Sequence, residues 1–170
     1  RELWRALRKR GIPKNTVKLL RDLYSNARCR VRSENQLGPW FKVACGVRQG
    51  PVEGPFLANI YMDHMMRKVL HQHPNLEIAF RYRLDGRWVD EEEMDHETRT
   101  SCLMYADDCA LFASSEADLQ TLYTSLVEGF KAEGMLISLS KTEASVYRAW
   151  VSASDWLDLK IYHTDGTKVK

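Results

Sequence analysis

The feature that most constrains the fold is a pair of adjacent aspartates, Asp107 and Asp108, which separates two apolar runs in the segment LMYADDCALFA (103–113). Each run has the length of a β-strand, and Asp favours turns because its side chain hydrogen-bonds the nearby backbone. The segment therefore predicts an antiparallel hairpin with both carboxylates at its tip. Two like charges this close repel each other unless a cation or water lies between them. A solvated turn and a metal site are both compatible with this pattern.

Helical periodicity dominates the first 27 residues of the chain. Apolar residues recur at spacings of three and four, as in Leu3 and Leu7 and later in Val17 and Leu20, and this spacing is typical of an amphipathic helix. The sequence Gly-Ile-Pro at 11–13 interrupts the pattern. We expect two basic helices joined by a sharp corner.

A two-stranded ribbon is predicted next. The segments RCRVRSEN (28–35) and WFKVACG (40–46) alternate polar and apolar residues around a turn at 36–39. Alternation along one strand would put Arg28, Arg30 and Arg32 on one face. Three arginines on a strand face suit a phosphate backbone, although an edge strand protected by charges has the same appearance.

The rest of the chain mixes helices and strands. Residues 56–73 predict a helix with Gly54 as its N-cap and Pro74 after its end, and residues 77–89 predict a hairpin around Asp85-Gly86. The acidic run at 90–97 is typical of a solvated loop. A helix is expected at about Glu116–Glu133 and a strand near 135–138. The order indicates an α+β domain in which helices cover one face of an antiparallel sheet.

Charge is distributed unevenly along the 170 residues. Residues 1–50 contain 13 Lys and Arg against three acidic residues, whereas the remainder contains 12 against 20, so the formal net charge of +2 hides a basic half and an acidic half. This division favours a polyanion partner on one side and cations on the other. Ordinary solvated helix faces would also explain the basic half.

Length and composition narrow the class of protein. A chain of 170 residues with 44% hydrophobic residues can bury the core of one domain, and because it begins with Arg1 we interpret it as a piece of a longer polypeptide. The four cysteines form no CxxC motif, which argues against a zinc site or disulfide framework. His71 and His73 fit a frayed helix end better than a metal pair. No apolar run is long enough to cross a bilayer, so we expect a soluble intracellular protein of the nucleus or cytoplasm, without a membrane partner.

Three motifs in sequence order carry a family resemblance. The loop GVRQG (46–50) precedes the helix that contains Asn59, YADD follows at 105–108, and Gly134 is followed by KTE at 141–143. This set resembles motifs B, C and D in the palm of reverse transcriptases, and it is most similar to those of non-LTR (LINE-type) retrotransposons. The run FRYRLDGRW (80–88) resembles a hairpin of some LINE groups. The resemblance extends from Arg1 to about Arg148.

The resemblance implies a domain organisation and an activity. Residues 1–45 would form helices and ribbon at the base of the fingers, residues 46–148 the palm, and residues 149–170 an unassigned extension toward the thumb. The activity would be RNA-directed DNA synthesis, with an RNA template, a DNA primer and dNTPs as partners. Two Mg²⁺ (or Mn²⁺) ions roughly 3.5–4 Å apart would be the cofactors.

The resemblance also assigns roles to individual residues. Asp107 would be the principal metal ligand and Asp108 would support it, while Lys141 would lie near the pyrophosphate as a proton donor or point charge. An exposed lysine at a strand end is the alternative for Lys141. The residues expected to bind template and nucleotide are Arg28, Arg30, Arg32, Arg48, Gln49, Gly50, Asn59 and Tyr105.

Departures from the family pattern leave other interpretations open. Residues 51–54 read PVEG, where LINE-type enzymes commonly have Cys or Asp, Val or Pro, Leu and Ser, and Ala58 stands where an aromatic residue is usual. A further catalytic Asp is expected upstream of Arg1. The alternatives are a non-catalytic or domesticated nucleic-acid-binding remnant of the palm, and a metal-binding regulatory module in which Asp107 and Asp108 act without Gln49 and Gly50.

Overall fold

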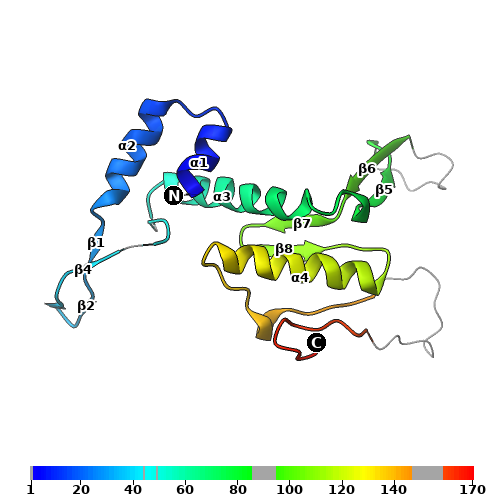
Figure 1. Cartoon of the computed structure of the whole chain (residues 1–170). Coiled ribbons are helices and arrows are strands. Elements are labelled where there is room, and N and C mark those ends of the chain that lie inside the picture. The colour runs from blue at the N-terminus through cyan, green and yellow to red at the C-terminus, as the bar shows by residue number, and fades with distance from the viewer. Residues whose placement is uncertain (1, 44, 49, 86–94, 147–158) are drawn as a thin grey trace. The chain divides into compact units, whose positions relative to one another are not determined.

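The computed structural model describes residues 2–43, 45–48, 50–85, 95–146 and 159–170. They belong to two compact units, Arg1–His64 and Met65–Lys170. Helices and short antiparallel strand pairs make up both units (Figure 1), which confirms the predicted α+β class. The single antiparallel sheet that we predicted is wrong for the described residues, because each strand there pairs with only one other strand.

The two helices predicted at the start of the chain are confirmed. Helix α1 spans Glu2–Lys9 and α2 spans Lys14–Ser25. The corner between them contains Gly11, whose φ of 79° suits glycine because a Cβ disfavours the left-handed region. Leu7 of α1, Val17 of α2 and Leu57 of α3 (Glu53–Leu70) form the core of the first unit.

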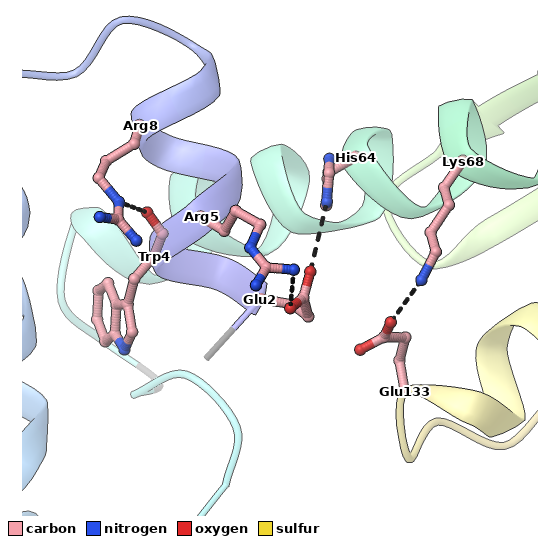
Figure 2. Close-up of polar contacts among 7 residues, drawn as sticks. All are labelled: Glu2, Trp4, Arg5, Arg8, His64, Lys68 and Glu133. Carbon is pink, nitrogen blue, oxygen red and sulfur yellow. Dashed lines mark hydrogen bonds and ion pairs between the residues drawn. The ribbon is translucent and has the colours of Figure 1, made fainter.

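Polar contacts around this core connect α1 and Arg10, the residue that follows it, to α3. Figure 2 shows the Glu2 carboxylate between Arg5, at 2.8 Å, and His64, at 4.0 Å. Arg10, just after α1, pairs with Asp63. The hydrophobic contacts of Leu7 supply most of the stabilisation, because partly exposed ion pairs contribute roughly 0–1 kcal/mol each.

The ribbon differs from the prediction in its turn and its continuity. Strand β1 (Arg28–Cys29) pairs with β4 (Phe41–Lys42), and β2 (Arg32–Ser33) pairs with β3 (Gln36–Leu37). The turn lies at Glu34–Asn35, where both φ values are positive (43° and 67°), and not at 36–39. Two left-handed residues in succession make a tight two-residue hairpin loop, and asparagine is favoured there. The break after β1 means that strand alternation does not by itself put the three arginines on one face.

Helix α3 (Glu53–Leu70) is close to the predicted helix but shifted. It begins at Glu53, so Gly54 lies inside its first turn and is not its N-cap, and it ends three residues before His73. The His73 amide donates to the Leu70 carbonyl at 2.9 Å, and its ring nitrogen Nε2 lies 2.7 Å from Ser125 Oγ. A short 3-10 helix, η1 (Pro74–Leu76), follows. The ring contact with Ser125 is a tertiary interaction that helix periodicity does not reveal.

The hairpin predicted around Asp85-Gly86 has a different partner strand. Strand β5 (Ile78–Tyr82) pairs along its whole length with β6 (His96–Thr100), whereas the predicted partner at 87–89 lies outside the described residues. Cross-strand contacts explain why β6 is the partner of β5. Arg81 Nε lies 3.2 Å from a Glu97 carboxylate oxygen, and the rings of Tyr82 and His96 are 5.7 Å apart. The last two residues of the acidic run, His96 and Glu97, therefore belong to a strand. Residues 90–94 of the run lie outside the described residues.

The second unit packs around helix α4 (Glu116–Ala132), which confirms the helix predicted there. Ser115 caps it by accepting a hydrogen bond from the Asp118 amide at 3.1 Å. The core of this unit includes Tyr123 and Val127 of α4 with Ile161 and Val169 from the end of the chain, and Leu111 of β8 (Asp108–Leu111) packs against it. Gly129 permits a close approach, because a Cβ there would lie 2.7 Å from Val69 Cγ2.

The strand predicted near 135–138 is not formed. Gly134 ends α4 with a φ of 77°, its amide donates to Lys131, and the Met135 amide donates to Phe130 at 2.9 Å. This Schellman-type cap uses the Met135 amide that a strand would need. A 3-10 helix, η3 (Leu139–Lys141), follows.

The end of the chain, for which the sequence suggests no assignment, packs onto α4. The Gln120 side chain accepts from the Tyr162 amide at 2.7 Å and donates to its carbonyl at 2.9 Å. Tyr162 also forms a bridge with Lys168. Residues 149–158 of the predicted extension lie outside the described residues. Among the helices that the structure describes, none is long and apolar enough to cross a membrane.

Tyr123 makes the stability of the second unit dependent on pH. Its ring is buried, and its hydroxyl lies 2.6 Å from Nδ1 of His163. Burial raises the pKa of Tyr123 above its ordinary value of 10.0, so the unfolded chain loses this proton first as the pH rises. We expect the free energy of unfolding to fall as the pH rises above that ordinary value.

Chemical denaturation at pH values below and above 10.0, the ordinary pKa of tyrosine, measures how the free energy of unfolding depends on pH. The Tyr123→Phe variant is the comparison. The variant is expected to be less stable at neutral pH by about 1 kcal/mol, because the hydrogen bond to His163 is lost. It should also lose less stability than the parent at alkaline pH. An equal alkaline loss in both proteins would contradict the assignment to Tyr123.

Candidate functional site

The predicted hairpin at Asp107 and Asp108 is confirmed. Strands β7 (Cys102–Tyr105) and β8 (Asp108–Leu111) are antiparallel, and the closing pair is Tyr105 with Asp108. Ala106 and Asp107 are therefore the two loop residues. Ala106 has a φ of 53°, the left-handed conformation that such a loop needs at its first central position and that usually selects glycine. The sheet of at least three strands expected around this hairpin is not formed by the described residues, where β7 and β8 pair only with each other.

Pairing decides which way the hairpin residues face. Directly opposed residues point to the same side of a ladder, so Asp108 shares its side with Tyr105, whose side chain is 83% exposed. The other side carries Leu111, which packs against the core of α4. Asp107, in the loop, and Asp108 are both exposed. Within the described part of the chain, neither carboxylate has a side-chain hydrogen bond or an ion pair, so their oxygens are open to a cation.

Lys141 is not brought into contact with these carboxylates. It is the last residue of η3, it is exposed, and its amide donates to the Ser138 carbonyl at 3.2 Å. Among the described residues, no hydrogen bond or ion pair joins its ammonium group to Asp107 or Asp108. Its role at the pyrophosphate stays a prediction.

The loop that resembles motif B lies in the first unit. Gly46 and Gly50 have φ values of 85° and 99°, so both use the conformational freedom of glycine. Arg48 and Asn59, the latter on α3, are exposed. Gln49 lies outside the described residues. Arg48, Gly50 and Asn59 belong to one unit and Asp107 to the other, so their joint action on one substrate stays a prediction.

Gly54 is required by the packing of this loop on the first turn of α3. A Cβ at Gly54 would overlap the carbonyl oxygen of Arg48, which is backbone and has little room to shift. The contact therefore requires glycine at position 54.

We expect Gly54→Ala to lower the free energy of unfolding by about 1–3 kcal/mol, because steric overlap outweighs the better helix propensity of alanine. Chemical denaturation measures it. The matched control is Gly38→Ala, whose Cβ would lie an ordinary 3.5 Å from the Val31 carbonyl oxygen. Equal effects of the two changes would contradict the close approach.

Two arginines of the ribbon, Arg28 and Arg30, lie near Trp40, a residue that sequence reasoning missed. The Arg30 guanidinium lies over the Trp40 ring, 4.5 Å from its centroid, and Arg32 donates to the Asn35 side chain at 3.1 Å. Arg28 and Arg48 line a pocket together with Trp40. The signal in the sequence was an aromatic residue within the basic ribbon, a combination typical of nucleic-acid-binding surfaces.

Other side chains of types that can bind metals have different surroundings. Asp63 pairs with Arg10, and the His73 ring lies against Ser125. All four cysteines are free thiols. The thiol contact with Cys102 raises the pKa of Cys109 above its ordinary value, and partial desolvation acts in the same direction. Among the described residues, no group of three or more His, Cys, Asp and Glu is arranged to hold a metal ion.

Comparisons with known proteins identify the family of this chain. Residues 1–163 match the family described as reverse transcriptase (RNA-dependent DNA polymerase), so the match continues past Arg148. The chain is 25% identical over 135 residues to the retrovirus-related Pol polyprotein from type-1 retrotransposable element R2 of Nasonia vitripennis, covering 79% of this chain and 11% of that protein. It thus spans about one tenth of the length of that curated relative. The chain belongs to the reverse transcriptase (RNA-dependent DNA polymerase) family, as a domain of the non-LTR type.

Proposed function

We propose that this chain is the palm region of an RNA-directed DNA polymerase of a retroelement, and that it contributes to template-directed nucleotidyl transfer. The observation that carries the proposal is the exposed hairpin tip, where the carboxylates of Asp107 and Asp108 have no side-chain partner in the described part of the chain. Family membership supports the same activity. The substrates would be an RNA template, a DNA primer and dNTPs.

The hairpin tip suits Mg²⁺ or Mn²⁺. Hard divalent cations prefer oxygen ligands, and Mg²⁺ usually binds one or two carboxylates together with substrate phosphates. When bound, two such ions would stabilise charge on the attacking 3′-oxygen and on the leaving pyrophosphate. Asp107 would be the principal ligand and Asp108 the supporting one. By resemblance to the family, a third carboxylate would come from a strand upstream of α1.

Other residues would bind and orient the substrates. Arg28, Arg30 and Arg32 would hold template phosphates, because guanidinium groups bind phosphate in bidentate geometry. Gly50 would allow the backbone to approach the incoming base pair, with Arg48, Gln49 and Asn59 beside it. Tyr105 lies on the same side of the hairpin as Asp108 and would contact the primer end or the nucleotide. Lys141 would supply a positive charge or a proton to the pyrophosphate.

A second candidate is a non-catalytic nucleic-acid-binding domain that keeps this fold. The observation that favours it is Glu53, the first residue of α3 and the acidic residue of its first turn. A carboxylate at a helix N-terminus offsets the positive end of the helix dipole, which would otherwise attract phosphate. The basic ribbon would still bind a polyanion in this case.

Primer extension distinguishes the two candidates. The protein that carries residues 1–170 would be assayed on an RNA template with a DNA primer, dNTPs and Mg²⁺. We expect incorporation that follows the template sequence and stops when the divalent ion is chelated. Tight binding of template and primer without incorporation, both with Glu53 and with Glu53→Leu, would overturn the polymerase proposal in favour of the second candidate.

A further inference from the structure

A pocket in the first unit combines an aromatic surface with positive charge. It has a volume of about 430 Å³, within the range of roughly 300–1,000 Å³ that is typical of ligand pockets. Its apolar lining comes from Leu23, near the end of α2, and from Trp40. Arg28 and Arg48 supply its guanidinium groups, and the remaining lining residues are Asn26 and Ala27.

The indole of Trp40 is both accessible and held in place. Its side chain is 58% exposed, although large aromatic residues usually bury most of their surface. The Arg30 guanidinium lies 4.5 Å from the ring centroid, a contact that restricts the indole and brings a third positive charge beside the pocket. An exposed but oriented aromatic ring is suited to stacking on a planar ligand.

We propose that this pocket binds one nucleotide of a single-stranded nucleic acid, with the base stacked on Trp40 and the flanking phosphates bound by Arg28 and Arg48. The inference rests on the proposed function, because it assigns the pocket to the nucleic acid that the domain copies. It adds a specific base-stacking position, centred on Trp40, to the interface of that nucleic acid.

The chemistry of the lining favours a single strand over other anions. Bases in a duplex stack on one another and cannot offer a face to an indole, whereas an unpaired base can. An acidic peptide would satisfy Arg28 and Arg48 but leave the exposed indole and Leu23 without a planar partner. The 2′-hydroxyl is the group by which RNA and DNA differ, and nothing in stacking or phosphate binding requires it, so both kinds of strand should bind.

Equilibrium binding of the whole 170-residue chain tests the proposal. The probes are single-stranded RNA and DNA of about 12 nucleotides, a length within known site sizes for single-strand binding, and a strand of the same length without bases. We expect Trp40→Ala to raise the Kd for strands with bases about 5- to 100-fold, which is the usual effect of removing a stacking aromatic residue. The Kd for the strand without bases should not change.

Two variants serve as controls for Trp40→Ala. Trp40→Phe keeps an aromatic face and should recover most of the affinity. Phe41→Ala removes a neighbouring aromatic side chain that is 52% exposed but does not line the pocket, and it should leave the Kd unchanged. Intrinsic fluorescence gives a readout in the parent protein: strands with bases should quench tryptophan emission, and Trp40→Phe should lose that quenching even if Trp40→Ala folds poorly.

Several results would overturn the assignment. They are an equal loss of affinity for strands with and without bases in Trp40→Ala, a similar loss in Phe41→Ala, and competition by duplex or polyglutamate as strong as that of the single strand. Glu128→Gln, at an exposed position of α4, should leave every one of these constants unchanged. The binding assays contain no primer, dNTPs or divalent cation. Failure of base-dependent binding and failure of primer extension are therefore separate outcomes, and each bears on its own proposal.

Discussion

Asp107→Asn is expected to lower the rate of primer extension by several orders of magnitude in a reverse transcriptase that carries this domain. The amide that replaces the carboxylate keeps the size of the side chain but removes the negative charge that would hold a divalent cation. Nucleotidyl transfer depends mainly on charge stabilisation by such cations, since the protein supplies little covalent chemistry. Single-turnover incorporation on an RNA template, at saturating primer and dNTP, measures the effect.

The location of Asp107 makes this substitution easy to interpret. Asp107 is an exposed loop residue whose side chain has no hydrogen bond or ion pair in the described part of the chain. Exposed substitutions of this kind usually change the free energy of unfolding by less than about 0.5 kcal/mol, so the variant should unfold at the same temperature as the parent. Asp108→Asn should have a smaller effect on the rate.

A matched control distinguishes the loss of a metal ligand at Asp107 from a general effect of removing one negative charge. Glu128→Gln removes one negative charge from an exposed position on α4 and should leave the rate unchanged. Binding of Mn²⁺, followed by its effect on the relaxation of water protons, should weaken in Asp107→Asn and not in the control. If Asp107→Asn extended primers at the parent rate, Asp107 would not be the principal ligand.

Features that depend on neighbouring residues could be predicted from the sequence. The spacing of Leu3, Leu7 and Val17 indicated α1 and α2, and the apolar runs around Asp107 indicated β7 and β8. These patterns work because helix turns and tight hairpins join residues that are close in the chain. The carboxylate pair of the candidate site lies in such a hairpin, so its local geometry was accessible as well.

Features that depend on distant partners were not predictable in this way. The partner of β5 is β6, beyond a long connection, and pairs such as Arg81 with Glu97 select it. The strand expected after Gly134 is absent because the cap of α4 uses the Met135 amide. The pocket requires the end of α2, the start of β1, Trp40 and the loop at Arg48 to meet. No short-range pattern contains that information.

The turn of the ribbon shows a third kind of error. Gly38 and Pro39 are strong turn residues, yet the hairpin turn lies at Glu34–Asn35, and Gly38 instead donates its amide to the Val31 carbonyl at 2.9 Å. Asparagine tolerates the left-handed region, so a turn at Asn35 was compatible with the sequence. Local propensity allowed two turns, and the hydrogen bonds of β2 with β3 selected one.

The largest expected effect on binding comes from neutralising the arginines of the first unit. We expect a variant with four arginines changed to alanine to lose affinity for single-stranded RNA, and to lose most of its dependence on salt. The four are Arg28, Arg30, Arg32 and Arg48. Each phosphate that a cation neutralises contributes roughly 0.7 for a single strand to the slope of log K against log salt, so four contacts account for a slope of about 3. The parent should then bind on the order of 60-fold more weakly when the salt concentration is raised fourfold.

A second fourfold variant tests whether location matters more than net charge. It removes the same number of positive charges from exposed positions of α1 and α2, namely Lys9, Lys14, Lys18 and Arg21. If the ribbon and the Arg48 loop hold the phosphates, this variant should keep most of the salt dependence. The four charges that it removes would attract the strand only from a distance, and such attraction is screened within about 10 Å at 0.1 M salt. Equal loss of slope in the two variants would mean that the whole basic half attracts nucleic acid without a defined track. A flat salt dependence of the parent would count against phosphate contacts by any of these residues.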